Sequence, residues 1–195
     1  MRRSTAANLT TRPRGPNDRG RRDRIAAAAM RVIIATGLAG LTHRAVADEA
    51  NVPLGSTTYY FADRNDLLVA AMHVAIKAER RLIARYVESD EGTLAQRLAK
   101  LLAAQTVNRH SRDRLRAAYE LYVVAARSDV LRSISAQWDS VLRDAIACRC
   151  DEETARYLYA VVSGLALESA VADSRVNAAT AARLLERVGG TAQRH

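Results

Sequence analysis

The chain has 195 residues, which corresponds to about one or two domains and is long enough to bury a hydrophobic core without disulfides. Its 30 Lys and Arg against 21 Asp and Glu give a net charge of +9, which indicates a polyanionic partner such as nucleic acid or an anionic membrane surface. Hydrophobic residues make up 49%, largely Ala, Leu and Val, so we expect an all-α fold and exclude a sandwich or barrel.

No segment predicts a membrane helix, because the longest apolar run, residues 25–30, is far shorter than the ~20 residues that a span needs. No signal-peptide core follows the N-terminus, so we expect a cytoplasmic protein with no membrane partner. Cys148 and Cys150 cannot make a disulfide framework and fit a reducing compartment. The pair could bind a soft metal or sense oxidants, but a metal site needs three or four ligands, and no metal site is expected.

Positive charge is concentrated in residues 1–24, which contain eight Arg and two Asp. Residues 1–17 also contain Pro13, Gly15 and Pro16 and lack apolar periodicity, which predicts a disordered basic arm. The arm is either a solvated tail with no role or a segment that gathers DNA phosphates or enters a minor groove.

Apolar residues at three- and four-residue spacing predict a first helix from residue 18 to a stop at Gly37. Two short helices follow, over 43–50 and 54–61, separated by a tight turn at 51–53. A long fourth helix begins near Arg64 and ends at Asp90-Glu91-Gly92. Five more helices are expected over 93–110, 112–126, 129–147, 151–174 and 177–188, and the predicted N-caps are Thr42, Thr93, Ser128, Asp151 and Asn177.

Two short helices joined by a tight turn and preceded by a bracing helix predict a helix-turn-helix, whose second helix enters the DNA major groove. Small and hydrogen-bonding residues crowd positions 55–60, so this helix can approach DNA closely and its hydroxyl groups suit phosphates. Arg44 suits a bidentate contact to a guanine edge, and Pro53 and Leu54 can touch a thymine methyl group.

Residues 22–69 resemble the DNA-binding domain of the tetracycline-repressor (TetR) family, above all in the stretches LTHRAVA (41–47) and VPLGSTTYYFADRNDLL (52–68). The resemblance implies an all-helical homodimer with about nine helices per subunit, a three-helix DNA-binding head and a ligand-binding body. It also implies phosphate contacts from His43, Ser56, Tyr59, Tyr60 and Arg64, and base contacts from Arg44, Leu54 and Thr58.

Three positions depart from the family pattern. Thr58 stands where an aromatic residue is common, which changes the base readout. Asn51 stands where Gly is common and keeps access to a left-handed turn, and Arg64 stands where Lys is expected and keeps the charge. The predicted DNA-contacting residues are Thr42, His43, Arg44, Pro53, Leu54, Gly55, Ser56, Thr58, Tyr59, Tyr60 and Arg64. Alternative roles remain for some of them, since Tyr60 could fill the head's core beside Phe61, and His43 and Arg44 could be solvated.

Residues 151–174 carry two apolar faces, which predicts a helix buried on two sides. One face would pack on the protein's own core, and small residues on the other would let a second subunit approach closely. Together with the last helix, this predicts a two-fold four-helix interface, the alternative being a single large core. The predicted interface residues are Ala160, Gly164, Leu167, Val171, Ala181, Leu184, Leu185 and Val188.

Four polar or aromatic side chains interrupt apolar stripes of the body, at Gln105, Tyr119, Tyr122 and Trp138. Each buried amide, phenol or indole needs a hydrogen-bond partner, which is either a ligand or another protein group. Glu120 and Glu168 are further candidates, and an acidic residue near aromatic rings would favour a cationic ligand.

We therefore predict a basic arm (1–17), a helix-turn-helix domain (18–64) and a ligand-binding and dimerisation domain (65–195). The predicted function is that of a ligand-responsive repressor, which binds a palindromic DNA operator as a homodimer and is released by a small molecule. No HExxH spacing, Gly-rich phosphate loop or GxSxG elbow occurs, so we expect neither catalysis nor a cofactor. The alternatives are a ligand-independent architectural DNA-binding protein and a helical enzyme or binding protein without DNA activity.

Overall fold

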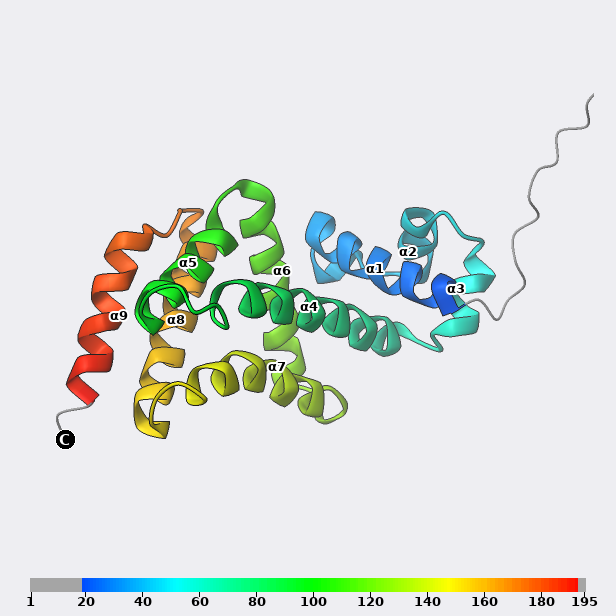
Figure 1. Cartoon of the computed structure of the whole chain (residues 1–195). Helices are drawn as coiled ribbons and strands as arrows, with labels where there is room; N and C mark the ends of the chain where they lie inside the picture. Colours follow the sequence, from blue (N-terminus) through cyan, green and yellow to red (C-terminus); the bar gives the residue numbers. More distant parts are fainter. Residues whose placement is uncertain (1–18, 193–195) are drawn as a thin grey trace, which may run out of the picture.

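The computed structural model describes residues 19–192, which form nine α-helices and one short 3-10 helix, with no strand among them. The all-α fold predicted from the composition is thereby confirmed (Figure 1). The basic arm predicted for residues 1–17 lies outside the described residues. The elements in chain order are α1 (Arg19–Thr36), η1 (Leu38–Gly40), α2 (His43–Ala50), α3 (Leu54–Tyr60), α4 (Arg64–Tyr86), α5 (Leu94–Thr106), α6 (Arg109–Ala126), α7 (Asp129–Ala147), α8 (Glu152–Ala172) and α9 (Ala178–Ala192).

Left-handed residues end the first two helices, as the sequence predicted. Gly37 follows α1 with a φ of 70°, and Asn51 follows α2 with a φ of 51°. These are the residue types for which the left-handed conformation costs least. The two stops leave α1 to brace the short pair α2 and α3.

The first three helices form one end of the molecule, at the right of Figure 1. Its core contains Ile25 and Ile33 of α1, Val46 of α2 and Phe61, which directly follows α3. Phe61 is fully buried, so its predicted role as the plug of this small core is confirmed. We call residues 19–63 of the structure the head.

Helix α4 leaves the head and enters the remaining helices, which we call the body (Figure 1). Leu67 and Met72 of α4 belong to the core of the head, whereas Ile83 belongs to a second core within the body. The first core also contains Leu121 of α6 and Ile134 of α7. Head and body therefore share packed side chains and are not separated by a linker.

Several helix termini differ from the predictions by a few residues, among them the end of α4 at Tyr86 and the end of α9 at Ala192. The break between α5 and α6 lies at residues 107–108, not at residue 111, because the Asn108 side chain accepts a 2.9 Å hydrogen bond from the Ser111 backbone N–H and caps α6. Ser128 stands at the predicted N-cap of α7, but its side chain makes no capping bond. The caps at Thr93 and Asp151 form as predicted.

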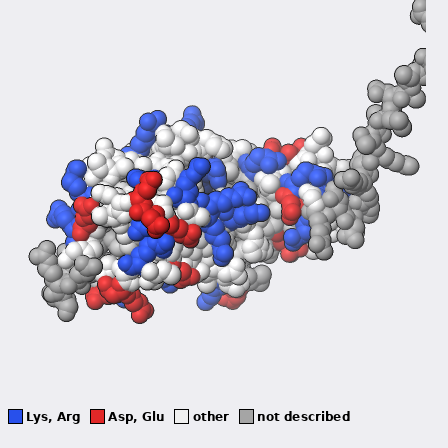
Figure 2. All heavy atoms as spheres, in the orientation of Figure 1, with Lys and Arg blue, Asp and Glu red and all other residues white. Residues whose placement is uncertain are grey.

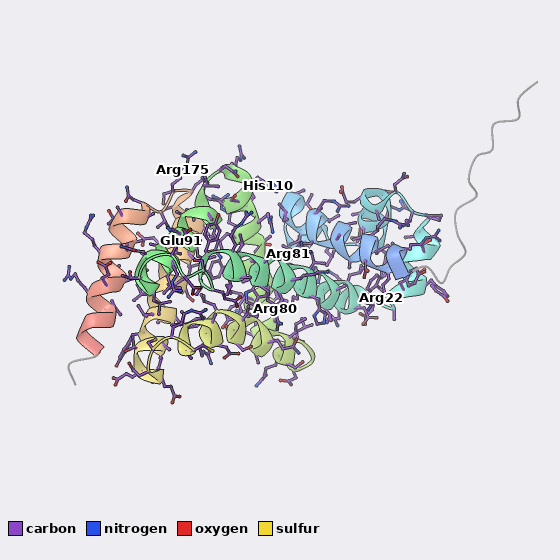
Figure 3. All side chains as sticks on the ribbon, viewed as in Figure 1. Arg22, Arg80, Arg81, Glu91, His110 and Arg175 are labelled. Atoms are coloured by element: carbon purple, nitrogen blue, oxygen red, sulfur yellow. The ribbon has the colours of Figure 1, made fainter. Side chains whose placement is uncertain are left out.

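Basic side chains extend beyond the head along the exposed face of α4, at Lys77, Arg80, Arg81 and Arg85. Figure 2 shows blue side chains gathered over the middle of this face, where Figure 3 places Arg80 and Arg81. Such a surface attracts polyanions over several ångströms before contact. Within residues 19–192, no helix has the length and apolarity needed to cross a membrane.

Candidate functional site

The helix-turn-helix is fixed by local hydrogen bonds that the sequence only partly revealed. The Thr42 hydroxyl accepts from the Ala45 backbone N–H at 3.1 Å and caps α2. Thr57, which was not among the predicted functional residues, is buried, and its hydroxyl lies 2.8 Å from the Leu54 carbonyl and 3.4 Å from that of His43. The second contact joins α3 to α2, so Thr57 helps to hold the angle between the two helices.

Most of the predicted DNA-contacting residues in α2, the turn and α3 are exposed at the surface of the head. Two large side chains stand out, since Leu54 is 45% exposed and Tyr59 is 62% exposed. Gly55 faces open space, because a Cβ placed there would meet no atom within 4 Å. The other exposed members are Thr42, Arg44, Pro53 and Thr58.

His43, Ser56 and Tyr60 are only partly buried and lie beside this surface. The His43 Nδ1 atom is buried without a hydrogen-bond partner. Arg64 has a structural role that the sequence did not reveal, since its Nη2 donates to the Leu38 carbonyl at 2.6 Å and its Nε to that of Leu41 at 3.3 Å. Because a guanidinium group has five N–H donors, further donors remain for a phosphate.

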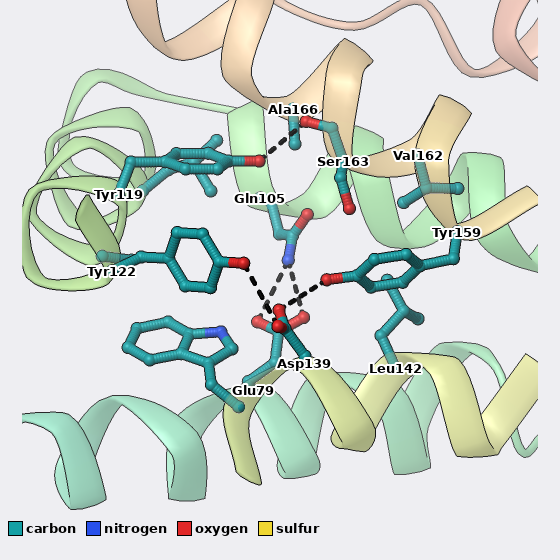
Figure 4. A pocket seen from close by; sticks show the side chains of 13 residues that line it. Glu79, Gln105, Tyr119, Tyr122, Asp139, Leu142, Tyr159, Val162, Ser163 and Ala166 are labelled. Carbon is teal, nitrogen blue, oxygen red and sulfur yellow. Dashed lines mark hydrogen bonds between the residues drawn. The ribbon is translucent and has the colours of Figure 1, made fainter. Parts of the chain in front are cut away.

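A cavity of about 250 Å³ lies in the body, enclosed by α4, α5, α6, α7 and α8 (Figure 4). We call it the effector cavity, after the role that we propose for it below. The structure brings all four predicted ligand residues into its wall: Gln105, Tyr119, Tyr122 and Trp138. It adds polar residues that sequence reasoning missed: Glu79, Asp139, Tyr159 and Ser163. Its remaining lining is mainly apolar, with Leu115, Ala118, Leu142, Val162 and Ala166.

The polar groups of the effector cavity are paired with one another (Figure 4). The Gln105 amide donates to both carboxylate oxygens of Glu79, at 3.0 and 3.1 Å. The Tyr122 and Tyr159 hydroxyls donate to separate oxygens of Asp139, at 3.1 and 2.8 Å. The Tyr119 hydroxyl donates to the Ser163 carbonyl at 2.8 Å. The two carboxylates are therefore held in fixed orientations.

Burial governs the protonation of these groups. It raises the pKa of Glu79, against the opposing effects of the Gln105 hydrogen bond and the Arg114 charge. Burial, together with the hydrogen bond to Asp139, raises the pKa of Tyr159 to about 12, and burial also raises that of Tyr119. The phenols stay protonated at neutral pH and present neutral aromatic faces, which attract positive charge, while burial favours the uncharged form of the Glu79 carboxyl in the empty cavity.

A signal for the two missed carboxylates exists in the sequence. Glu79 falls in register with buried Ala75 and Ile83 on α4, four residues from each, so it interrupts an apolar stripe. Asp139 likewise falls between buried Ser135 and Leu142 on α7. Carboxylates at core positions are rarely left unpaired, and such positions are candidates for a functional site.

The two acidic candidates named from the sequence lie elsewhere. Neither Glu120 nor Glu168 lines the effector cavity. Instead, the Glu120 carboxylate accepts a 3.1 Å hydrogen bond from the backbone N–H of Leu38 in the head. Helix α6 thus contacts the head through Glu120 and the effector cavity through its neighbour Tyr119.

Helix α8 has the two apolar faces that the sequence predicted. Leu158, Val162 and Ala166 are buried in the body, whereas the opposite face is open and Val171 is 80% exposed. The predicted interface residues on this open face are Ala160, Gly164, Leu167 and Val171, with Leu184 exposed on α9. No atom lies within 4 Å of a Cβ placed on Gly164.

Part of the predicted interface on α9 faces the core of this chain. Ala181 and Leu185 are buried within this chain, at 4% and 0% exposure, and Val188 packs against the same core. The reason is that α9 lies against α5, which supplies Leu98 and Leu102 to that core, so its most apolar stripe is already covered.

The two cysteines lie at the end of α7, where Cys148 is exposed and Cys150 partly buried. Burial raises the pKa of the Cys150 thiol, which lowers its reactivity. Among the described residues, no three or more His, Cys, Asp or Glu side chains converge in an arrangement suited to a metal ion.

Solved structures similar to this one are regulators and drug-binding proteins. The multidrug binding protein EbrR in complex with ethidium is 39% identical, with a TM-score of 0.76, and the match covers 86% of this chain and 98% of EbrR. EbrR is also known in complexes with imidazole, proflavin and malachite green. A TetR family member from Streptomyces coelicolor A3 is 39% identical, with a TM-score of 0.76, over 86% of this chain and 97% of that chain.

Family models match both parts of the sequence. The model of bacterial regulatory proteins of the tetR family matches residues 25–71, and the model of the tetracyclin repressor-like C-terminal domain matches residues 89–191. The HTH-type transcriptional regulator PksA of Bacillus subtilis (strain 168) is 27% identical over 176 residues, which are 80% of this chain and 82% of PksA. With its helix-turn-helix head and its nine described helices, the chain belongs to the TetR family of transcriptional regulators.

Proposed function

We propose that the protein is a homodimeric repressor, which binds a palindromic operator and is released from it by an aromatic cation. One observation carries the proposal: the effector cavity holds two carboxylates, Glu79 and Asp139, among four aromatic side chains. A cation between aromatic faces and a carboxylate is stabilised by both. The α4 helix that carries Glu79 also begins in the head.

The ligands of EbrR support this class of effector. Ethidium, proflavin and malachite green are aromatic cations, and EbrR binds each of them. In this chain, we assign the positive charge to Glu79, because a ligand would have to displace only the single Gln105 amide from it, whereas Asp139 accepts from two separate phenols. Trp138 and the three tyrosines supply the aromatic faces.

Operator recognition would use two copies of the head. The open face of α8, with Gly164 at its centre, allows close approach of a second subunit, as expected for the family's dimers. Two recognition helices about 34 Å apart would enter successive major grooves. Arg44, Leu54 and Thr58 would read bases, and the surrounding hydroxyl groups would contact phosphates.

Ligand binding would act on the head through α4 and α6. Both helices line the effector cavity, and both contact the head, α6 through the bond from Leu38 to Glu120. A ligand shifts the equilibrium only if it binds the DNA-releasing conformation more tightly. A shift from 99:1 to 1:99 needs roughly 5.5 kcal/mol of differential affinity.

Footprinting on the DNA that flanks the gene tests the proposal. We expect a protected inverted repeat that malachite green abolishes at concentrations that saturate the protein. Arg44→Ala should lose the footprint, whereas Arg175→Ala, an exposed change between α8 and α9 and away from the basic surface of α4, should keep it. The same dye titration with Glu79→Gln controls for binding of the dye to DNA. If the dye abolishes the footprint of the wild type but not that of the variant, release depends on the ligand site; if it abolishes both, the dye acts on the DNA.

Two outcomes would contradict the proposal. A footprint that no aromatic cation affects would refute the proposed effector class. Diffuse protection that disappears as salt rises would instead indicate an architectural DNA-binding protein, since phosphate contacts without base readout depend on salt alone.

A further inference from the structure

A second cavity, of about 170 Å³, adjoins the effector cavity on the side of the head. We call it the head-side cavity. Its wall includes Met30 of α1 and Val74, Ala75 and Ala78 of α4, so it touches two helices of the head's core. The residues that line both cavities are Glu79, Gln105, Leu115, Ala118 and Trp138.

The two cavities share a hydrogen-bonded pair of side chains in their walls. Of the shared residues, Glu79 and Gln105 are bonded to each other by the amide group, at 3.0 and 3.1 Å. Glutamine side chains rotate about single bonds, so a ligand that offers Glu79 a better partner can displace this amide. A ligand of the proposed class would therefore break the contact between Glu79 and Gln105 and join the two cavities.

The volumes require that a large ligand use both spaces. Binding sites for drug-sized molecules measure roughly 300–1,000 Å³. The effector cavity, at about 250 Å³, and the head-side cavity, at about 170 Å³, are each below that range, but together they fall within it.

We propose that the head-side cavity is a second subsite of the effector site, which takes a flat apolar group of a cation whose charge lies beside Glu79. The inference rests on the proposed function and adds the shape of the effector to it. Because Glu79 lines both cavities, the charge lies between two aromatic groups, one in each cavity.

The head-side cavity is lined mainly by apolar side chains, and Ser111 and Arg114 are its polar members besides Glu79 and Gln105. The apolar part of the wall suits such a group, and the charge of the ligand stays at Glu79. Trp138 offers an aromatic face, and the Met30 thioether makes favourable contacts with ring edges. Small side chains at Ala75, Ala78 and Ala104 leave the space for a ring. A group that fills it presses on Met30 of α1 and so acts on the head directly, whereas a ligand confined to the effector cavity does not reach α1.

The experiment fills the head-side cavity and measures binding of two cations of different size. Ala104→Leu places a larger apolar side chain in that cavity alone, and Ala103→Leu, one residue away on α5, is the matched control outside both cavity walls. Trp138 is the single tryptophan of the chain and lines both cavities, so its fluorescence reports binding of either probe without DNA present. The probes are ethidium and the one-ring cation phenyltrimethylammonium.

We expect Ala104→Leu to weaken ethidium binding at least about tenfold, which corresponds to ~1.4 kcal/mol, and to leave the Kd of phenyltrimethylammonium unchanged. Ala103→Leu should change neither value. Should Ala104→Leu fold poorly, as judged by circular dichroism, Ala78→Leu fills the same cavity from α4.

Equal ethidium affinity in the wild type and a folded cavity-filling variant would overturn the second subsite and leave the proposed effector class intact. Weakening of both probes to the same extent would also overturn it, because the substitution would then disturb the effector cavity itself. Failure of the wild type to bind either cation would refute the effector class and the subsite together.

Discussion

Substitution of Glu79 by Gln tests the effector chemistry most directly, because it should change ligand affinity and stability in opposite directions. The two side chains have nearly the same shape, and Gln105 can still donate to the amide oxygen at position 79, so the packing is kept. Only the charge is lost. Burial raises the pKa of Glu79, which means that the folded protein holds the carboxylate at a cost.

The expected loss of ligand affinity is large. Removal of one partner from a buried, hydrogen-bonded charge pair costs about 2–5 kcal/mol, which is roughly 30- to 5,000-fold in Kd. We expect Glu79→Gln to weaken ethidium binding within that range. A neutral aromatic compound of similar size should bind both proteins equally, since it makes no charge pair.

The pH dependence has a definite sign. In the free protein Glu79 releases its proton at a higher pH than a carboxyl in the unfolded chain, whose pKa is about 4.5. The wild-type free energy of unfolding therefore falls, relative to that of the variant, as pH rises from 4.5 through the raised pKa, and the difference is constant above it. Over the same window, the affinity of the wild type for a cation should rise, and that of the variant should not.

Trp138 fluorescence measures the affinities, and thermal unfolding followed by circular dichroism measures the stabilities. Glu88→Gln, an exposed change after the end of α4, is the control and should alter neither quantity. The reasoning would be refuted if Glu79→Gln bound ethidium as tightly as the wild type. It would equally fail if the variant were less stable than the wild type at neutral pH.

Three further substitutions test the head, the dimer and the body. Gly55→Leu should stabilise α3, by roughly 0.5–1 kcal/mol on helix propensity, yet abolish operator binding in a mobility-shift assay, because the open space above Gly55 is where DNA would approach. Gly164→Leu should convert the dimer to a folded monomer in sedimentation experiments, since the added side chain meets nothing within its own subunit. Asp173→Asn should destabilise the protein at neutral pH by denaturant unfolding, because Arg112 and Arg116 hold the pKa of Asp173 below its usual value, and the difference should vanish as pH falls below 3.8 through that lowered pKa.

Each of these has an outcome that contradicts it. Operator binding by folded Gly55→Leu would move the DNA-contacting surface away from α3. If Gly164→Leu remained a dimer, the open face of α8 would not be the interface between subunits. Ala136→Leu, an exposed change on α7, is the control for the effect of a surface leucine. A stability difference for Asp173→Asn that persisted in acid would show that its charge is not what the two arginines require.

The sequence by itself determined the local structure and the character of the parts. Asn51 and Gly37 fixed the turns, since few other residues adopt a left-handed conformation at low cost, and the Thr42, Thr93 and Asp151 caps set helix starts. These signals depend on a few neighbouring residues, so they can be read along the chain. The polar interruptions at Gln105, Tyr119, Tyr122 and Trp138 were visible for the same reason.

Only the tertiary structure decided which distant residues meet. Glu79 and Asp139 stand 60 residues apart in the chain, and nothing local shows that both line one cavity. Leu185 lies in an apolar stripe that could equally face a second subunit or α5, and only the packing of α9 on α5 chose between them. A helical pattern gives the direction of a side chain around its own axis, but the partner on that side is set by how all the helices pack together to bury their apolar faces.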